Sequence, residues 1–245
     1  MLDREQVSPH LVRLTLGGQD GFASTGFPDE WVALVVPGQF QSRYYTVRSA
    51  GDGRMVLDVV VHEVGLVTGW ASGDCVGDTV TLSEPKGSFD PPPHAGWLML
   101  VGDLTAMPAM ARIAESSTLP TRIWAEVPDA LPGYLPDRAE VTWLTPPSDG
   151  GSALAEVVEG IAWPEGEGYF WMAGESAQMR AIRKHLMRER QLPPAAYDVM
   201  GYWRGVRERQ PRAVDPGPIY RAGKAAGKTD EQIWDDYDRA RDEQQ

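Results

Sequence analysis

Cysteine is almost absent from this sequence of 245 residues, which contains only Cys75. A disulfide within the chain and a cysteine-ligated metal or iron–sulfur site are therefore excluded, because each requires more than one thiol. Histidines are also few and do not have the spacing of metal ligands; they are His10, His62, His94 and His185. We predict that the chain holds no metal through Cys or His side chains.

Positive charge is scarce too. Lys and Arg number 23 against 35 Asp and Glu, so the net charge is −12 and the sequence pI is about 4.8. A nucleic-acid binder needs a dominant basic face, and acidity disfavours anionic membrane surfaces, so we expect neither partner. A small anionic ligand is compatible with this net charge, because a local pocket can oppose it.

Long apolar runs are missing as well. No stretch approaches the roughly 20 residues that cross a bilayer, and residues 1–5 lack the charged-then-apolar pattern of a signal peptide. We therefore expect no membrane insertion and a cytoplasmic location. The rest of the composition is ordinary for a globular protein, with 42% hydrophobic and 24% charged residues. The length suffices for one large domain or two modest ones.

Residues 1–93 predict a small antiparallel barrel of six strands. Short segments with alternating or β-branched apolar residues are separated by turns that contain glycine and proline. The strands recognised in this way are residues 11–16, 31–36, 43–49, 55–62 and 79–82, and a short helix is expected at residues 67–72.

The pattern changes after three consecutive prolines at positions 91–93, which indicate a linker. From residue 94 to 210 strands alternate with helices, which is typical of an open parallel sheet covered on both faces. The strands are expected at residues 97–101, 121–127, 140–144, 169–172 and 197–202, and the helices at 108–116, 153–161 and 177–190. Residues 211–245 are predicted to form a tail in which the segment beginning at Thr229 resembles a capping box and opens a short helix.

The segment Arg43-Tyr44-Tyr45-Thr46-Val47-Arg48 is the first candidate site. Arg43 and Tyr45 share one face of the predicted strand, and Tyr44 and Thr46 share the other. A flavin needs a flat surface to stack on, a hydrogen-bond partner near its ring nitrogens and a cation for its diphosphate, and these side chains supply all three. An ordinary barrel strand with a solvated arginine and packed tyrosines is the alternative.

A glycine turn between His62 and a helix near Val67 is the second candidate. The first amides of a helix are free and carry partial positive charge, so they bind phosphate readily. A plain strand-to-helix turn, with a structural His62 and with Trp70 in the core, is the alternative.

Two glycine-containing segments follow strands of the predicted α/β domain. Gly102-Asp103-Leu104-Thr105 and Gly174-Glu175-Ser176 are predicted to be loops at the carboxyl ends of strands, where open α/β sheets bind ligands. The sequence lacks a G-x-G-x-x-G fingerprint, so the prediction of a nucleotide cleft depends on both segments together. The aromatic residues of Gly201-Tyr202-Trp203-Arg204 either line the same crevice or pack in the core.

In this order, these segments resemble the siderophore-interacting protein family, which belongs to the ferredoxin-reductase-like flavoproteins. The resemblance spans residues from about 11 to 205 and implies an FAD that is held non-covalently. It implies that Arg43 binds the diphosphate, that Tyr45 stacks on the isoalloxazine and that the Thr46 hydroxyl lies beside the reactive edge. Val67 and Thr68 match the backbone donors at the helix start.

The resemblance also implies a nicotinamide-nucleotide cleft at Thr105, Gly174 and Glu175. The sequence departs from the family pattern at two places. Leu104 stands where an acidic residue is usual, and the turn at residues 65–68 contains larger side chains than usual. The predicted catalytic residues are Thr46 and Tyr45. The predicted cofactor-binding residues are Arg43, Tyr44, Tyr45, Thr46, Arg48, His62, Val67, Thr68, Trp70, Asp103, Thr105, Gly174, Glu175 and Trp203.

The family reduces ferric siderophores. The resemblance therefore implies an enzyme that passes electrons from NADH or NADPH, or from a reduced ferredoxin, through FAD to Fe(III), and so releases iron in the cytoplasm. Arg48, Arg204 and Arg207 are candidates for contacts with the anionic substrate. Two alternatives stay open: a general NAD(P)H:flavin or ferredoxin-type oxidoreductase, which would share the fold, and a non-catalytic binder of siderophore or flavin.

Overall fold

The computed structural model describes residues 1–38, 42–62, 65–148 and 150–204, together with residues 222, 226 and 228. Residues Met1–Arg204 form one compact unit. The predicted tail helix and Arg207 lie outside the described residues. None of the helices described is long and apolar enough to span a bilayer.

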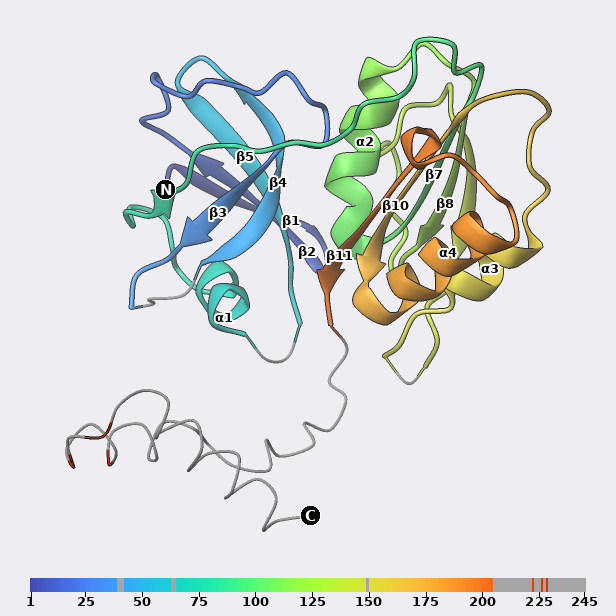
Figure 1. Cartoon of the computed structure of the whole chain (residues 1–245). Helices are drawn as coiled ribbons and strands as arrows, with labels where there is room; N and C mark the ends of the chain where they lie inside the picture. The colour runs from blue at the N-terminus through green and yellow to red at the C-terminus, as the bar shows by residue number, and fades with distance from the viewer. Residues whose placement is uncertain are drawn as a thin grey trace. The chain divides into compact units, whose positions relative to one another are not determined.

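The first sheet is antiparallel and has six strands in the order β1-β2-β5-β4-β3-β6, as predicted (Figure 1). Backbone hydrogen bonds between Met1 and the segment that leads into β6 bring the two edges together, with Gly77 N donating to Met1 O at 2.9 Å. The strands are β1 (Asp3–Ser8), β2 (Leu11–Leu16), β3 (Trp31–Val35), β4 (Arg43–Gly51), β5 (Arg54–Val60) and β6 (Thr81–Leu82).

Alternating side chains of these strands form an apolar core. On β2 and β3, Val12, Leu14, Val32 and Leu34 are fully buried in it. Helix α1 (Leu66–Ser72) matches the predicted helix and buries Val67 and Ala71 against the same core. Burial of these side chains is the main favourable contribution to the stability of the sheet.

The second sheet is parallel, with five strands in the order β11-β10-β7-β8-β9. Helix α2 packs on one face, and α3 and α4 pack on the other (Figure 1). The doubly covered sheet explains the continuous apolar strands of the sequence. The strands are β7 (Leu98–Asp103), β8 (Thr121–Glu126), β9 (Glu140–Leu144), β10 (Tyr169–Glu175) and β11 (Tyr197–Trp203), and the helices are α2 (Met107–Ser116), α3 (Leu154–Gly160) and α4 (Ser176–Arg188).

The ends of two strands differ from the prediction. β7 continues through Asp103, and β10 continues through Glu175, so that α4 begins directly at Ser176. The predicted loop at Gly174-Glu175 is therefore wrong: these residues end a strand. The cause is parallel pairing with β11, in which Gly174 lies opposite Gly201 and Glu175 lies opposite Trp203.

Arg112 of helix α2 forms hydrogen bonds that connect the α/β domain to the first sheet. Its Nη1 donates to Val47 O of β4 at 2.6 Å, and its Nη2 donates to Glu30 Oε1 at 3.0 Å. The Glu30 side chain is 1% exposed. Its carboxylate also accepts from the hydroxyls of Ser24 and Thr25 and from the Thr25 amide. A buried charge with this many donors is well compensated.

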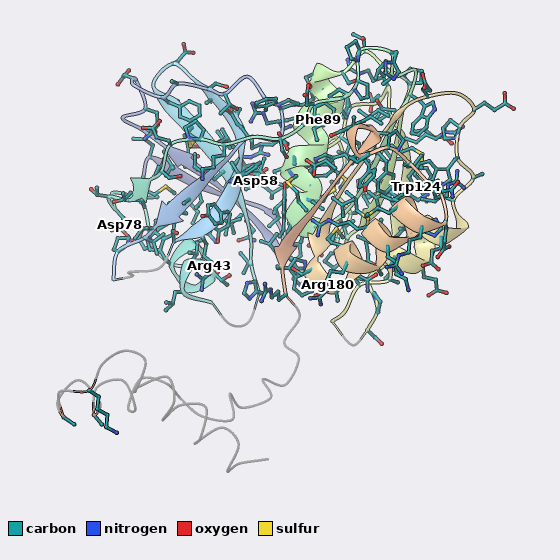
Figure 2. The ribbon with its side chains drawn as sticks, in the orientation of Figure 1. Arg43, Asp58, Asp78, Phe89, Trp124 and Arg180 are labelled. Atoms are coloured by element: carbon teal, nitrogen blue, oxygen red, sulfur yellow. The ribbon has the colours of Figure 1, made fainter. Side chains whose placement is uncertain are left out.

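The Asp58 side chain, labelled in Figure 2, accepts a second hydrogen bond that connects the two domains. The hydroxyl of Tyr134, from the loop after β8, donates to Asp58 Oδ2 at 2.5 Å. Arg13 holds both oxygens of the Asp58 carboxylate at 2.8 Å. The guanidinium of Arg48 lies 5.5 Å from the Tyr134 ring centroid, within cation–π range.

Replacing Tyr134 with phenylalanine is expected to lower the free energy of unfolding by about 1–3 kcal/mol, because the buried carboxylate of Asp58 loses a short hydrogen bond. Urea denaturation of the two proteins measures this difference. Tyr44→Phe is the control, since Tyr44 is 67% exposed and its hydroxyl is expected to contribute less than about 0.5 kcal/mol. Equal stability of Tyr134→Phe and the wild type would show that the hydrogen bond does not contribute.

Strand β9 forms one edge of the parallel sheet. Trp143 on this strand is 47% exposed. Glu140 at its start forms an exposed ion pair with Arg122 of β8, with 3.0 Å between Arg122 Nε and Glu140 Oε2. The edge thus combines a large apolar side chain with a charged one.

Candidate functional site

The carboxyl ends of β7, β10 and β11 bring five predicted residues together. Asp103, which ends β7, is buried and accepts hydrogen bonds from both sides. The Thr105 amide and hydroxyl donate to Asp103 Oδ1 at 2.9 and 2.5 Å, and Trp203 Nε1 donates to Oδ2 at 2.6 Å. Gly174 and Glu175 lie on the strand between them. The predicted crevice residues are therefore neighbours.

No cation lies among the described groups that contact the Asp103 carboxylate. Burial raises the pKa of Asp103 above its ordinary value, although hydrogen bonds from Thr105 and Trp203 oppose this effect. Position 174 cannot carry a side chain unless Asp103 moves, since a Cβ there would lie 2.5 Å from Asp103 Oδ2. Gly174 has φ 153, which side chains rarely allow. The glycine is thus required by both space and backbone conformation.

Glu175 has a role that the sequence did not indicate. Its carboxylate caps α4 by accepting from the amides of Ala177 and Gln178 at 2.6 and 3.0 Å. These amides are the ones that would otherwise be offered to an anion at the helix start. In this structure the Glu175 side chain caps α4. An interaction of Glu175 with a nucleotide remains a prediction.

The predicted flavin residues of β4 differ in exposure. Arg43 and Tyr44 are exposed, Tyr45 is half-buried and Thr46 is 6% exposed. Figure 2 shows Arg43 at the lower end of the first sheet. Tyr45 lies opposite Val32 and packs partly against the core of that sheet, as the predicted alternation of faces requires. Burial raises the pKa of Tyr45 to about 12, so its hydroxyl is neutral at physiological pH.

Tyr202 on β11, which the sequence placed either in the crevice or in the core, has a buried hydroxyl. Burial raises the pKa of Tyr202 above its ordinary value, while the hydroxyl of Thr46 lowers it. Tyr202 packs with Met200 in the cluster on the α2 face of the parallel sheet. The alternation of side chains along β11 could have indicated this shared face.

The start of α1 lies after β5, as predicted. The first backbone bond of the helix runs from Gly69 N to Gly65 O at 2.8 Å. The amides of Leu66, Val67 and Thr68 therefore have no partner within the helix. The N-cap residue Gly65 supplies no side-chain cap, so these amides are well suited to a phosphate.

Of the other predicted residues, Trp70 and Arg48 have structural partners. Trp70 Nε1 donates to Asp78 Oδ2 at 2.8 Å, and the ring packs partly against the core of the first sheet. Arg48 pairs with Glu115 of α2, with Nη2–Oε1 at 2.6 Å. His62 is exposed, and so is Arg204. Binding by these four residues remains a prediction.

Comparison with known proteins identifies the chain. Residues 95–205 match the model of the siderophore-interacting protein family, and residues 39–89 match the siderophore-interacting FAD-binding domain. An uncharacterized protein of Mycobacterium tuberculosis (strain ATCC 25618 / H37Rv) is 32% identical over 246 residues, covering 81% of this chain and 86% of that protein. The chain belongs to the siderophore-interacting protein family.

More distant relatives of this siderophore-interacting protein have assigned activities. The ferric vibriobactin reductase ViuB of Vibrio cholerae (strain N16961) is 27% identical over 82% of this chain and 86% of its own length. The NADPH-dependent ferric-chelate reductase of Escherichia coli (strain K12) is 25% identical, covering 81% of this chain and 89% of that protein. These activities belong to the relatives.

Solved structures show the same fold. The siderophore-interacting protein of Acinetobacter baumannii has a TM-score of 0.73 at 23% identity, covering 92% of this chain and 95% of that one. A ferredoxin-NADP+ reductase of Plasmodium falciparum has a TM-score of 0.66 at 13% identity, covering 82% and 94%. The predicted ferredoxin-reductase-like architecture is confirmed.

Three features of the described residues fit FAD, the cofactor of the matched domain. The half-buried ring of Tyr45 offers an aromatic surface at the start of β4. The first amides of α1 are available to phosphate. The hydroxyl of Tyr202 is buried and has no hydrogen-bond partner among the described residues, so it can serve a ligand.

Proposed function

We propose that this siderophore-interacting protein is an FAD-dependent reductase of ferric siderophores that takes electrons from NADH or NADPH. The free amides at the start of α1 carry the proposal, because they lie in the part of the chain that matches the siderophore-interacting FAD-binding domain and they suit the phosphates of that cofactor. The neighbouring strand ends of the parallel sheet, at Asp103, Gly174 and Trp203, support a site for the electron donor. Two relatives with assigned activities, on ferric vibriobactin and on ferric chelates, support the same reaction class.

The chain's residues would orient the reactants and exclude water from them. Arg43 and the amides of Leu66, Val67 and Thr68 hold the diphosphate of the nucleotide. Tyr45 supports the ring, and the Thr46 hydroxyl bonds to its edge. An FAD held by these residues would supply the conversion between the two-electron donation of a nicotinamide and the single-electron transfers that the reduction of Fe(III) requires. Ferric chelators hold Fe(II) far less well, so this reduction releases iron from the substrate.

The crevice would receive the nicotinamide nucleotide. Asp103 fixes Thr105 and Trp203 at its wall, and the lack of a side chain at Gly174 makes room for the Asp103 carboxylate. Because Glu175 occupies the amides at the start of α4, the phosphates of the nucleotide are expected to bind elsewhere in the crevice. The domain boundaries that we propose, 1–93 for flavin and 94–210 for the donor, follow from this division of roles.

An anaerobic titration tests the proposal. The purified protein is loaded with FAD, and NADH or NADPH is added without oxygen while the flavin absorbance is followed. A ferric siderophore and a ferrous-iron trap are then added. We expect bleaching by one of the nicotinamides, followed by recovery of the absorbance together with formation of the trapped Fe(II) complex. Samples that lack the siderophore or the protein are the controls.

The possible failures separate the alternatives. A chain that takes up no FAD would refute the flavin site itself. Flavin that binds but resists both nicotinamides would favour a reduced ferredoxin as donor or a non-catalytic binder, and adding reduced ferredoxin distinguishes these two. Bleached flavin that no ferric chelate reoxidises would favour a general NAD(P)H:flavin oxidoreductase.

A further inference from the structure

A single hydroxyl lies between two carboxylates where the two domains meet. Ser88 belongs to the linker, residues 83–97 between β6 and β7. Its Oγ is 3.0 Å from Asp29 Oδ2 and 2.6 Å from Asp198 Oδ2, both of them hydrogen-bond distances. Asp29 precedes β3 of the first sheet, and Asp198 lies on β11 of the second. Ser88 therefore connects the two domains through two acidic side chains.

The two contacts need two protons, and the Ser88 hydroxyl has only one. A serine hydroxyl donates one hydrogen bond and accepts up to two, whereas an ionised carboxylate only accepts. Met200 Sδ, 3.4 Å from Ser88 Oγ, has no proton to give. With both carboxylates ionised, one of the short contacts would bring lone pairs together with no hydrogen between them. The distances are satisfied when one of the two carboxyl groups carries a proton.

Asp29 is the carboxylate better suited to the negative charge. Its Oδ1 accepts hydrogen bonds from the amides of Ser88 and Phe89, each at 3.0 Å. Asp29 is fully buried, and a buried carboxylate with several donors is stable in the ionised form. Asp198 makes the shorter contact with Ser88, and 2.6 Å is a usual length for a bond donated by a hydroxyl group. These contacts assign the proton to Asp198.

The surroundings of Asp198 act on its charge in both directions. Burial raises its pKa above the ordinary 3.8, and the charge of Asp29 raises it further. The hydrogen bond with Ser88 opposes this effect, and so do the Val199 amide and the positive charge of Arg183 on α4. The guanidinium of Arg183 donates to the Val199 carbonyl. Titratable side chains on β10, β11 and the linker complete the surroundings; they are Tyr169, Tyr202 and Asp90, and burial raises the pKa of both tyrosines.

We propose that Asp198 carries a proton when the linker lies against β11, and that loss of this proton as the pH rises loosens the linker. In the protonated form, Asp198 donates to Ser88 Oγ and Ser88 donates to Asp29 Oδ2. Deprotonation leaves one proton between two negative charges, and their repulsion favours movement of Ser88 away from Asp198. The fold thus contains a pH-sensitive contact between its domains. This inference does not depend on the flavin or on the proposed function.

Asp198→Asn tests the assignment of the proton, because an asparagine amide can donate to Ser88 at any pH. Between the ordinary pKa of 3.8 and the raised folded value, the folded wild type binds one proton more than the unfolded chain. Wild-type stability therefore falls through this interval as the pH rises. We expect the unfolding constant of the wild type, divided by that of the variant, to rise by up to about tenfold per pH unit and then to become constant. Urea denaturation of the full chain from about pH 4 to about pH 8 measures this ratio.

Asp129→Asn is the matched control. Asp129 follows β8 and also connects the domains, since Ser8 Oγ donates to its Oδ2 at 2.6 Å and the His10 amide donates to the same oxygen at 3.1 Å. Burial opposes its ionisation, but the hydrogen bonds from Ser8 and His10 lower its pKa below 3.8. This carboxylate therefore stabilises the fold in its charged form. Asp129→Asn is expected to be less stable than the wild type at every pH of the series, whereas Asp198→Asn is expected to become more stable than the wild type as the pH rises.

Two spectroscopic measurements follow the proton and the linker separately. Carboxyl ¹³C resonances are titrated by NMR, and the Asp198 signal is the one that Asp198→Asn lacks; its midpoint is expected to lie above 3.8. Hydrogen exchange reports on the linker through the amides of Ser88 and Phe89, which donate to Asp29. Their protection, corrected for the pH dependence of intrinsic exchange, is expected to fall with rising pH in the wild type and to stay constant in Asp198→Asn.

Three results would overturn the inference. A midpoint at or below 3.8 would show that Asp198 is ionised in the folded protein. A stability ratio that does not change with pH would show that folding takes up no extra proton at this position. Equal protection of the linker amides in the wild type and Asp198→Asn at every pH would show that the proton does not control the linker. None of these results affects the proposed function, which is tested separately by uptake and reduction of FAD.

Discussion

Replacing Arg112 with methionine is expected to lower the free energy of unfolding by about 3–5 kcal/mol, because the buried carboxylate of Glu30 loses its cationic partner. Methionine retains most of the apolar length of the arginine side chain. The variant also leaves Val47 O without the donor that lies 2.6 Å away in the wild type. Since Val47 follows Thr46, weaker FAD binding is expected as well. Urea denaturation and FAD titration measure the two effects.

Arg122→Met is the control for this prediction. Arg122 and Glu140 form a pair in which the side chains are 43% and 73% exposed. Such surface pairs contribute about 0–1 kcal/mol, so this variant is expected to unfold and to bind FAD much like the wild type. If both arginine variants lost the same amount of stability, the buried position of Glu30 would not be the cause.

The Glu30 carboxylate also makes the stability of the protein depend on pH. Burial opposes the ionisation of Glu30, but hydrogen bonds from Thr25, Ser24 and Arg112 outweigh it, so its pKa lies below the ordinary 4.5. A carboxylate with a lowered folded pKa contributes stability above its unfolded pKa and loses it as the pH falls through the folded value. The contribution of Glu30 is thus complete at neutral pH and disappears in acid below pH 4.5.

Replacing Gly174 with alanine is expected to abolish most NAD(P)H-dependent reduction while FAD remains bound. The new Cβ would lie 2.5 Å from Asp103 Oδ2, so Asp103 must move away from the Trp203 indole. Overpacking and the φ of 153 at this position together are expected to lower stability by about 2–4 kcal/mol. Anaerobic stopped-flow measurement of flavin bleaching gives the rate, and we expect a loss of at least about tenfold, in keeping with a misplaced reactant.

Gly160→Ala is the control for this substitution. Gly160 ends α3, and nothing lies within 4 Å of a Cβ placed there. Alanine is expected to be neutral or slightly stabilising at this position, because it has the higher helix propensity. A Gly174→Ala protein that reduces its flavin at the wild-type rate would contradict the proposed donor crevice.

Most of the fold could be predicted from the sequence because its strands and helices have clear apolar patterns. The strands of the parallel sheet are almost continuously apolar, and α4 shows Met179, Ile182 and Leu186 at helical spacing, all of them buried. Strand β1 was not predicted. Its sequence is polar, with residues such as Arg4 and Gln6, and it forms because it pairs with β2. Because this pairing depends on β2, it leaves no periodic pattern in the sequence of β1 itself.

The candidate site was predictable to the extent that it depends on strand ends. Asp103, Gly174 and Trp203 lie at or near the ends of three apolar strands, and neighbouring parallel strands bring their carboxyl ends together. The hydrogen bond from Arg112 of α2 to Val47 O of β4 joins residues far apart in the sequence, and no local pattern specifies such an approach. The helix cap of Glu175 was missed for a similar reason, because β10 was expected to end before it and a loop was assumed there.

The exposed edge at β9 has a practical consequence for handling the protein. An edge strand offers unpaired amides and carbonyls to any extended chain that approaches it, and the exposed Trp143 would favour such an encounter. The net charge of −12 keeps separate molecules apart, and salt weakens this repulsion by shortening its range. Association of concentrated samples at high ionic strength would therefore begin at this strand, and storage in dilute buffer would delay it.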